Sequence, residues 1–137
     1  MGNTSFDYER TPFYYETDKM GIVHHSNYIR WFEEARIAYM ENRGYPYSRM
    51  EKEGIMIPVL GVECRYKMPV KFGEIMVIHG RIELFDGLRL NVAYEIVGKD
   101  TGELHVTGRS EHCFVHADTF RPVKLTKKYP EMAEIFM

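Results

Sequence analysis

The residues best suited to chemistry lie close together in the segment TDKMGIVHHSNY, residues 17–28. Asp18 could activate a water molecule or attack a carbonyl carbon directly. Gly21 allows an unusual backbone turn or the close approach of a ligand. Because the segment leads into an amphipathic pattern, the free N–H groups at the start of a helix could hold a developing oxyanion. The same residues also suit a turn that Asp18 stabilises locally, so both interpretations stay open.

The histidines suggest a second kind of chemistry, which is metal binding. His24 and His25 are adjacent, so in an extended segment their rings point apart and do not readily share an ion. His112 and His116 fall on one face of a predicted strand, but no acidic or thiolate cluster accompanies them in the sequence. We therefore expect no metal and no other cofactor, and structural roles for the histidines outside the segment.

A serine or cysteine nucleophile has less support in the sequence. There is no G-x-S-x-G motif, and the alternating strand–helix units that would carry one are missing. Two cysteines, Cys64 and Cys113, are too few for a disulfide framework or a four-thiolate zinc site. Asp18 therefore remains the candidate for catalysis.

Length and composition predict a single globular domain over residues 1–137. The formal charge is −2 and there is no long basic run, which argues against nucleic acid as a partner. The apolar stretches are far shorter than the roughly 20 residues that a membrane span needs. The N-terminal residues MGNTSFDYER lack the layout of a secretory signal, so we expect a cytoplasmic protein.

Periodicity predicts the helices that must position the segment. The aromatic stretch 6–15 suggests a first strand before it. After it, apolar residues recur at steps of three and four and predict one long buried helix. These residues are Tyr28, Trp31, Phe32, Ala35, Ala38 and Tyr39. Ser26 or Asn27 would be the N-cap, and Gly44 would end the helix in the left-handed conformation. A short second helix is predicted over 46–53, and another in the tail, 125–137.

From residue 57 onward the period changes to two, which predicts strands. In residues 75–85 one face carries Met76, Ile78, Ile82 and Leu84. Residues 88–97 alternate in the same way, and Asp86-Gly87 between the two runs predicts a type I′ hairpin. The run 104–116 adds a further strand. The result is an α+β arrangement in which an antiparallel sheet wraps one helix, and its unprotected edges predict a dimer or larger assembly.

The segment YYETDKMGIVHHSNYIRWFEEAR, residues 14–36, resembles the signature of the 4-hydroxybenzoyl-CoA thioesterase family of hotdog-fold acyl-CoA thioesterases. The matching residues are Thr17, Asp18, Gly21, Val23, His25, Tyr28, Phe32, Glu34, Ala35 and Arg36. A second segment, CRYKMPVKFGEIMVI at 64–78, resembles the strand–Pro–aromatic–Gly–acid–strand stretch of that family. Two residues depart from the pattern. His24 stands where the family more often has Tyr or Phe, and Glu16 stands where relatives commonly carry an additional Asp.

The resemblance implies a hotdog fold, a five-stranded antiparallel sheet wrapped around one long central helix. It also implies a homodimer or homotetramer with the active site at the subunit interface. The substrate would be an acyl thioester of coenzyme A, or less often of acyl carrier protein, hydrolysed to a free carboxylic acid. Asp18 falls on the family's catalytic carboxylate, a general base or nucleophile, and His25 on the motif histidine that positions the thioester.

The resemblance further implies a set of substrate-binding positions. Backbone N–H groups near Val23 to His25 would polarise the thioester carbonyl, and Ile57, Pro58 and Val59 would line the acyl pocket. The full set is Gly21, Val23, Asn27, Tyr28, Ile57, Pro58 and Val59. Two other functions stay open, a non-catalytic acyl-thioester-binding or scaffold protein and a hydroxyacyl-thioester dehydratase.

Overall fold

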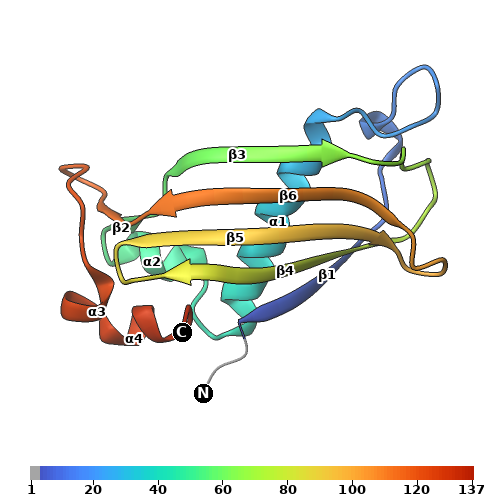
Figure 1. Ribbon diagram of the computed structural model, residues 1–137. Helices are drawn as coiled ribbons and strands as arrows, with labels where there is room; N and C mark the ends of the chain where they lie inside the picture. Colours follow the sequence, from blue (N-terminus) through green and yellow to red (C-terminus); the bar gives the residue numbers. More distant parts are fainter. Residues whose placement is uncertain (1–3) are drawn as a thin grey trace.

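Helix α1 (Ser26–Asn42) lies across one face of a five-stranded antiparallel sheet (Figure 1). This computed structural model describes residues 4–137, so the first three residues of the predicted domain lie outside the described part. The sheet order is β1-β4-β5-β6-β3. Its strands are β1 (Ser5–Arg10), β3 (Val59–Tyr66), β4 (Met76–Phe85), β5 (Arg89–Gly98) and β6 (Leu104–Cys113). The predicted α+β class and hotdog arrangement are confirmed.

The remaining elements are short and lie beside the main sheet. They are a 3-10 helix (Tyr14–Glu16), α2 (Tyr47–Lys52), β2 (Ile55–Met56), β7 (Val115–His116), α3 (Leu125–Lys128) and α4 (Pro130–Glu134). The second helix occurs where the sequence predicts it. The tail forms two helices, because Pro130 cannot continue α3 and instead occupies the first turn of α4. Among the described residues, no helix is long and apolar enough to cross a membrane.

The apolar face of α1 is buried against the sheet, as its periodicity predicts. Trp31, Phe32 and Ala35 have no exposed surface. The Phe32 ring stacks on Tyr94 of β5, with ring centroids 4.2 Å apart. Gly108 of β6 is needed for this approach, since a Cβ there would lie 2.4 Å from the Phe32 ring. Burial of each large side chain contributes about 1.5–3 kcal/mol, so this face anchors the helix that carries the candidate site.

Two predictions at the N-terminal end of α1 are wrong. Neither Ser26 nor Asn27 is the N-cap, because the cap position is His25 and its side chain makes no capping bond. Tertiary contacts explain the change, since the Asn27 amide donates to carbonyl groups outside the helix. The first strand also ends at Arg10 rather than continuing to residue 15. Pro12 cannot donate to a ladder, and the aromatic residues that follow it form an exposed 3-10 turn.

Two details of the β4–β5 hairpin also differ from prediction. Of the residues that join the two strands, only Gly87 has a positive φ, +92°, so the connection is not a type I′ turn, which needs two such residues. The Asp86 carboxylate explains this, because it accepts the backbone N–H groups of Leu88 at 3.0 Å and Arg89 at 2.7 Å. A register shift between Ile82 and Leu84 turns Leu84 outward, where it is 37% exposed instead of facing the core.

Candidate active site

Residues 16–24 form a tight hairpin that ends at the N-terminus of α1. The His24 N–H donates to the Glu16 carbonyl at 2.8 Å, and the Asp18 N–H donates to the Ile22 carbonyl at 2.9 Å. Gly21 closes the turn with φ +77°, a conformation that side chains other than glycine rarely adopt. The predicted turn is therefore real, and it fixes the backbone of Asp18.

A second set of contacts ties this hairpin to the segment before β4. The Val23 N–H donates to the Val70 carbonyl at 2.8 Å, and the Phe72 N–H donates to the Gly21 carbonyl at 3.3 Å. Ile22 also forms a β-bridge with Lys71. The two stretches that carry the family resemblance, 14–36 and 64–78, are thus in direct contact.

The Asp18 side chain is half-buried and divides its two oxygens between different environments. Oδ1 accepts the Met20 N–H at 2.8 Å, which is the local turn bond. Oδ2 has no hydrogen-bond partner within residues 4–137. The carboxylate also acts on Tyr28: burial chiefly raises the pKa of that phenol to about 12, and the charge of Asp18 adds to the rise. Asp18 therefore supports the turn and still presents one free oxygen.

His25 lies on the surface at the N-cap of α1. Its ring stacks on His24, with centroids 4.2 Å apart, and meets the edge of Tyr66 at 5.9 Å. His25 and Tyr66 border a shallow depression of about 490 Å³. The depression is lined by Ile22, Val23, His25, Tyr28, Tyr66, Lys67, Met68 and Pro69. The structure therefore brings together three predicted site residues, Val23, His25 and Tyr28.

Other predicted positions lie elsewhere. Asn27 is buried, and its amide donates to the carbonyl groups of Glu16 at 3.0 Å and His24 at 3.2 Å, so it fastens the hairpin to the helix. Ile57 and Val59 line a separate cavity of about 200 Å³ beside the second half of α1. Pro58 is half-buried between these two residues but does not line that cavity.

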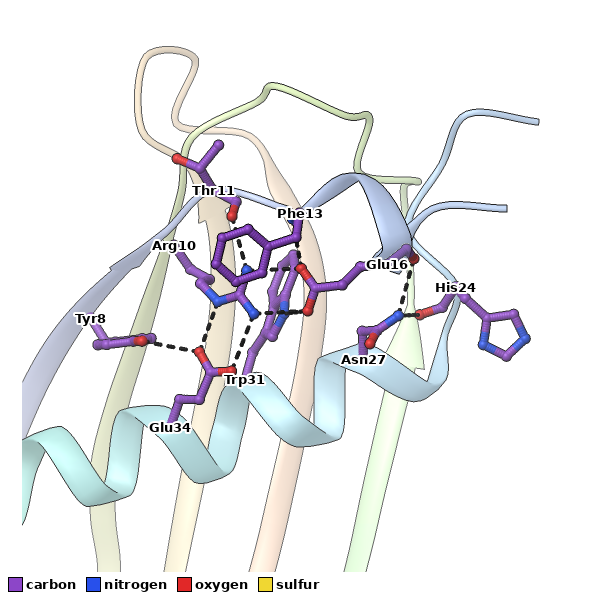
Figure 2. A network of polar contacts seen from close by, with 9 residues as sticks. All are labelled: Tyr8, Arg10, Thr11, Phe13, Glu16, His24, Asn27, Trp31 and Glu34. Atoms are coloured by element: carbon purple, nitrogen blue, oxygen red, sulfur yellow. Dashed lines mark hydrogen bonds and ion pairs between the residues drawn. The ribbon is translucent and has the colours of Figure 1, made fainter. Parts of the chain in front are cut away.

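A buried ion-pair network supports the hairpin from below (Figure 2). Arg10 of β1 forms a bidentate pair with Glu16, with both N–O distances 2.8 Å, and also binds Glu34 of α1 at 2.8 Å. Glu16 accepts two further hydrogen bonds, from the Phe13 N–H at 2.8 Å and the Trp31 indole N–H at 3.1 Å. The Glu16 carbonyl in turn accepts hydrogen bonds from the His24 N–H and the Asn27 side-chain amide. The network therefore positions the segment that follows Asp18.

The charge on Glu16 is stabilised by these partners. Burial opposes ionisation, but hydrogen bonds from Arg10, Phe13 and Trp31 outweigh it and lower the pKa of Glu16. Sequence reasoning noted Glu16 only as a departure from the family pattern and did not single out Arg10. The available signal was a pair of opposite charges six residues apart beside a predicted helix, which is common on solvated surfaces as well.

The cavity beside the second half of α1 contains a buried histidine, His112, which the sequence assigned a structural role. It is 1% exposed, and its Nε2 lies 2.7 Å from the Ser110 hydroxyl. Burial, and then the charge of Arg36, lower the pKa of His112 to about 3, while the nearby Pro58 carbonyl acts in the opposite direction. The ring is therefore neutral in the folded protein at neutral pH.

The buried ring predicts a pH-dependent stability. Unfolded His112 takes up a proton near pH 6.5 but the folded residue only near pH 3, so the unfolded state binds more protons between these values. The free energy of unfolding is therefore unaffected by protonation of this histidine above about pH 6.5. It should fall by about 4 kcal/mol on account of His112 as the pH is lowered toward 3. Urea unfolding of the wild type and His112→Phe at pH 7 and pH 4 measures this. Equal pH dependence in the two proteins would contradict the expectation.

The side chains of residues 4–137 provide no group of three or more His, Cys, Asp or Glu that could hold a metal ion. The hairpin and the start of α1 offer the Asp18 carboxylate, the His25 imidazole and backbone N–H groups. These groups suit acid–base or nucleophilic attack on a carbonyl carbon.

Comparisons with known proteins agree with this chemistry. The family model of the thioesterase-like superfamily matches residues 14–136. YneP of Bacillus subtilis (strain 168), whose name assigns it provisionally to the acyl-CoA thioesterases, is 39% identical over 118 residues, which are 86% of this chain and 85% of YneP. A 1,4-dihydroxy-2-naphthoyl-CoA hydrolase of Prochlorococcus marinus subsp. pastoris is 26% identical, covering 87% of this chain and 79% of the hydrolase.

A solved structure extends the likeness to the fold. The DHNA-CoA thioesterase from Staphylococcus aureus superposes with a TM-score of 0.90 at 36% sequence identity, covering 96% of this chain and 88% of that one. The chain belongs to the thioesterase-like superfamily.

Proposed function

We propose that this chain is an acyl-CoA thioesterase that hydrolyses an acyl thioester to a free carboxylic acid and coenzyme A. Its membership of the thioesterase-like superfamily and its sequence similarity to YneP and to the DHNA-CoA thioesterase support this reaction class. The observation that carries the proposal is the Asp18 carboxylate, held on a glycine-closed hairpin beside the start of a buried helix with one oxygen unengaged. The resemblance of residues 14–36 to the signature of the 4-hydroxybenzoyl-CoA thioesterases supports the further proposal that the chain belongs with them within the superfamily.

Asp18 supplies the reactive oxygen in this proposal. As general base, its Oδ2 takes a proton from the water that attacks the thioester carbon; as nucleophile, Oδ2 attacks that carbon itself and water then hydrolyses the anhydride. In both routes the C–S bond breaks and the coenzyme A thiolate leaves. In the first route it takes the proton that Asp18 received from water, and in the second it is balanced by the proton released when water hydrolyses the anhydride. His25, on the rim of the depression, orients the thioester.

The backbone at the start of α1 supplies the oxyanion donor. The N–H groups of Val23 and His24 already donate to Val70 and Glu16. The His25 N–H, by contrast, has no partner in the part of the chain that the structure describes. It also lies where the partial positive charge of the helix N-terminus is greatest. We therefore assign the developing oxyanion to the His25 N–H.

The unpaired edge of the sheet supports assembly into homodimers. β3 has a neighbour on one side only, and Val59, Leu60, Val62 and Tyr66 on it are between 42% and 61% exposed. Such an edge is a template for pairing with a second chain. An antiparallel two-fold pairing centred on β3 would set the Val59 end of the strand in one subunit beside the Tyr66 end of the same strand in the other. Since Tyr66 contacts His25 within its own chain, each hairpin would lie at the other subunit's cavity.

A charge at the centre of this edge should break the dimer. We expect wild type to sediment as a dimer or tetramer of the 16.2 kDa chain and Val62→Lys to sediment as a monomer, because the lysine would be desolvated in the joint sheet. Leu84→Lys is the matched control, since Leu84 is similarly exposed but lies on β4, inside the sheet. A monomeric wild type in sedimentation velocity would refute the assembly.

Thiol release from a panel of acyl-CoA and acyl carrier protein thioesters tests the reaction. The proposal expects free thiol and free acid in equal amounts from at least one substrate. A hydroxyacyl-thioester dehydratase would instead give an enoyl thioester without thiol release, and a non-catalytic binding protein would give neither product. Either of those outcomes would replace the thioesterase assignment.

A further inference from the structure

One buried polar side chain lies close to the hairpin but has no part in the reaction proposed above. His105 is the second residue of β6 and is 2% exposed. Its Nδ1 lies 3.0 Å from the Pro69 carbonyl oxygen. A carbonyl oxygen only accepts hydrogen bonds, so in the neutral ring Nδ1 carries the proton and Nε2 carries none. The imidazole therefore binds the chain just beyond the end of β3.

The backbone of His105 holds the same stretch of chain. Its carbonyl accepts the N–H of Lys67 at 2.8 Å and the N–H of Met68 at 3.0 Å. The pairing of β3 with β6 ends at Tyr66, so these bonds lie where the chain leaves the sheet. With the imidazole included, His105 binds each of the three consecutive residues 67–69. The two backbone bonds do not depend on the side chain, so a substitution of His105 removes the third bond alone.

The residues that follow Pro69 support the hairpin directly. The Val70 carbonyl accepts the Val23 N–H at 2.8 Å, and the Phe72 N–H donates to the Gly21 carbonyl at 3.3 Å. Figure 1 shows the start of β6, the end of β3 and the hairpin at the same end of the sheet. The Pro69 carbonyl and the Val70 N–H belong to one planar peptide unit. A bond that fixes the Pro69 carbonyl therefore also fixes the backbone at Val70.

The hairpin is thus held from two sides. The Arg10–Glu16 pair supports the end that joins α1, and segment 67–72 supports the rest. Ile22 forms a β-bridge to that segment, and its carbonyl accepts the Asp18 N–H at 2.9 Å. A shift of the segment would therefore move the backbone of Asp18. Misplacing a reacting group by about 1 Å costs about 100-fold in rate, so this support matters for catalysis.

We propose that His105 is a positioning residue of the thioesterase reaction. Its Nδ1–H bond to Pro69 holds segment 67–72 against the hairpin. The bond thereby fixes the place of the Asp18 carboxylate relative to the His25 N–H that receives the oxyanion. His105 acts through the segment and not on the substrate. The proposal rests on the thioesterase function proposed above, and it adds a buried residue that lies outside both stretches of family resemblance.

Two substitutions of His105 separate positioning from packing. His105→Asn keeps an N–H donor close to the place of Nδ1 but leaves much of the ring volume empty, whereas His105→Phe fills the volume without a donor. We expect His105→Phe to lower kcat for the best acyl-CoA substrate by about 10- to 100-fold and to change KM by less than about threefold. His105→Asn should keep kcat within about threefold of the wild type, although its free energy of unfolding falls.

His79→Phe is the matched control for these variants. It makes the same substitution at a histidine of β4 that is 43% exposed and pairs with Asp7, so kcat and KM should stay at the wild-type values. Steady-state thiol release gives both constants, and urea unfolding gives the free energy of unfolding. Wild-type kcat in His105→Phe would overturn the proposal. A larger loss of kcat in His105→Asn than in His105→Phe would do the same, because packing would then explain the effect.

The position of the imidazole proton tests the bond to Pro69 in the wild type itself. In protein labelled with ¹⁵N-histidine, the NMR signals of the neutral His105 ring should show the proton on Nδ1. A proton on Nε2 would contradict the bond and overturn the proposal. Because this measurement needs no variant, it holds even if His105→Phe does not fold.

Hydrogen exchange tests the support of the hairpin without relying on activity. The Val23 amide should exchange about 2- to 10-fold faster in His105→Phe than in the wild type, the range expected for one hydrogen bond, and should stay slow in His105→Asn. The Val92 amide, in the middle of β5, should be unchanged in both variants. An unchanged rate at Val23 in His105→Phe would overturn the proposal. If no thioester were hydrolysed, the thioesterase function would fail, and the exchange rates and the imidazole proton would decide whether His105 holds the hairpin.

Discussion

Replacing Asp18 with asparagine should lower kcat for the best acyl-CoA substrate by about 10²- to 10⁴-fold, the usual contribution of a catalytic base. The substitution separates the two roles of this residue. An asparagine oxygen can still accept the Met20 N–H, so the turn remains, whereas the free Oδ2 becomes an uncharged NH₂ group. A residue that only stabilised the turn would leave activity almost unchanged after this replacement.

Asp86→Asn provides a matched control for the Asp18 experiment. Asp86 also accepts backbone N–H groups of its own turn, but it lies in the β4–β5 loop. We expect this variant to retain wild-type kcat. Thermal unfolding and sedimentation of both variants should match the wild type, and steady-state thiol release gives kcat and KM. Near-full activity of Asp18→Asn would remove Asp18 from the chemistry, even if the thioesterase assignment held.

Replacing Arg10 with methionine should destabilise the protein by about 3–5 kcal/mol, because it leaves the Glu16 carboxylate buried without its ion-pair partner. Arg10 and Glu16 are 9% and 4% exposed, so water cannot take the place of the lost guanidinium. The double variant Arg10→Met/Glu16→Leu should recover much of this loss, since it removes the isolated charge as well. Urea unfolding at pH 7 gives the free energy of unfolding of the wild type, the single variant and the double variant.

The pH dependence gives an independent check on the Arg10 network. Because the folded-state pKa of Glu16 is lowered, its stabilisation is present above about pH 4.5 and is lost as the pH falls through the folded value. The difference in free energy of unfolding between the wild type and Arg10→Met should therefore become smaller at acid pH. Arg81→Met is the control, since Arg81 makes an exposed ion pair with Glu83 that is worth about 0–1 kcal/mol. Similar losses for Arg10→Met and Arg81→Met would contradict the buried-pair interpretation.

The network also links stability to the candidate site. Glu16 holds Arg10 through its side chain and receives the N–H of His24 and the amide of Asn27 through its carbonyl. Loss of Arg10 should therefore lower kcat as well as the free energy of unfolding, because the segment between Asp18 and α1 would lose its support. Preorganisation of this kind is what a site built on a hairpin requires.

Local sequence patterns were sufficient to predict the long helix and the long strands, and to identify Asp18 as the candidate catalytic residue. The 3.6-residue period of α1 reflects burial of one helix face, and the period of two in β4 and β5 reflects burial of one sheet face, so both are visible in a single sequence. The turn at Gly21 was predictable because its conformation is required by the backbone alone. The motif around Asp18 then identified the reaction class.

Contacts between distant residues were decided only by the tertiary structure. The N-cap of α1 moved to His25 because Asn27 found partners outside the helix, and Leu84 turned outward because a bulge shifted the register against β5. The same holds for the Arg10–Glu16 ion pair. It also holds for the hydrogen bonds that join Arg36, Tyr94, Ser110 and His112 in a row, in which successive residues are 58, 16 and 2 positions apart in the sequence. The sequence by itself determined which surfaces are buried, because burial follows the period of each element. The partners of the buried polar groups depend on how the elements pack, and only the fold brings them together.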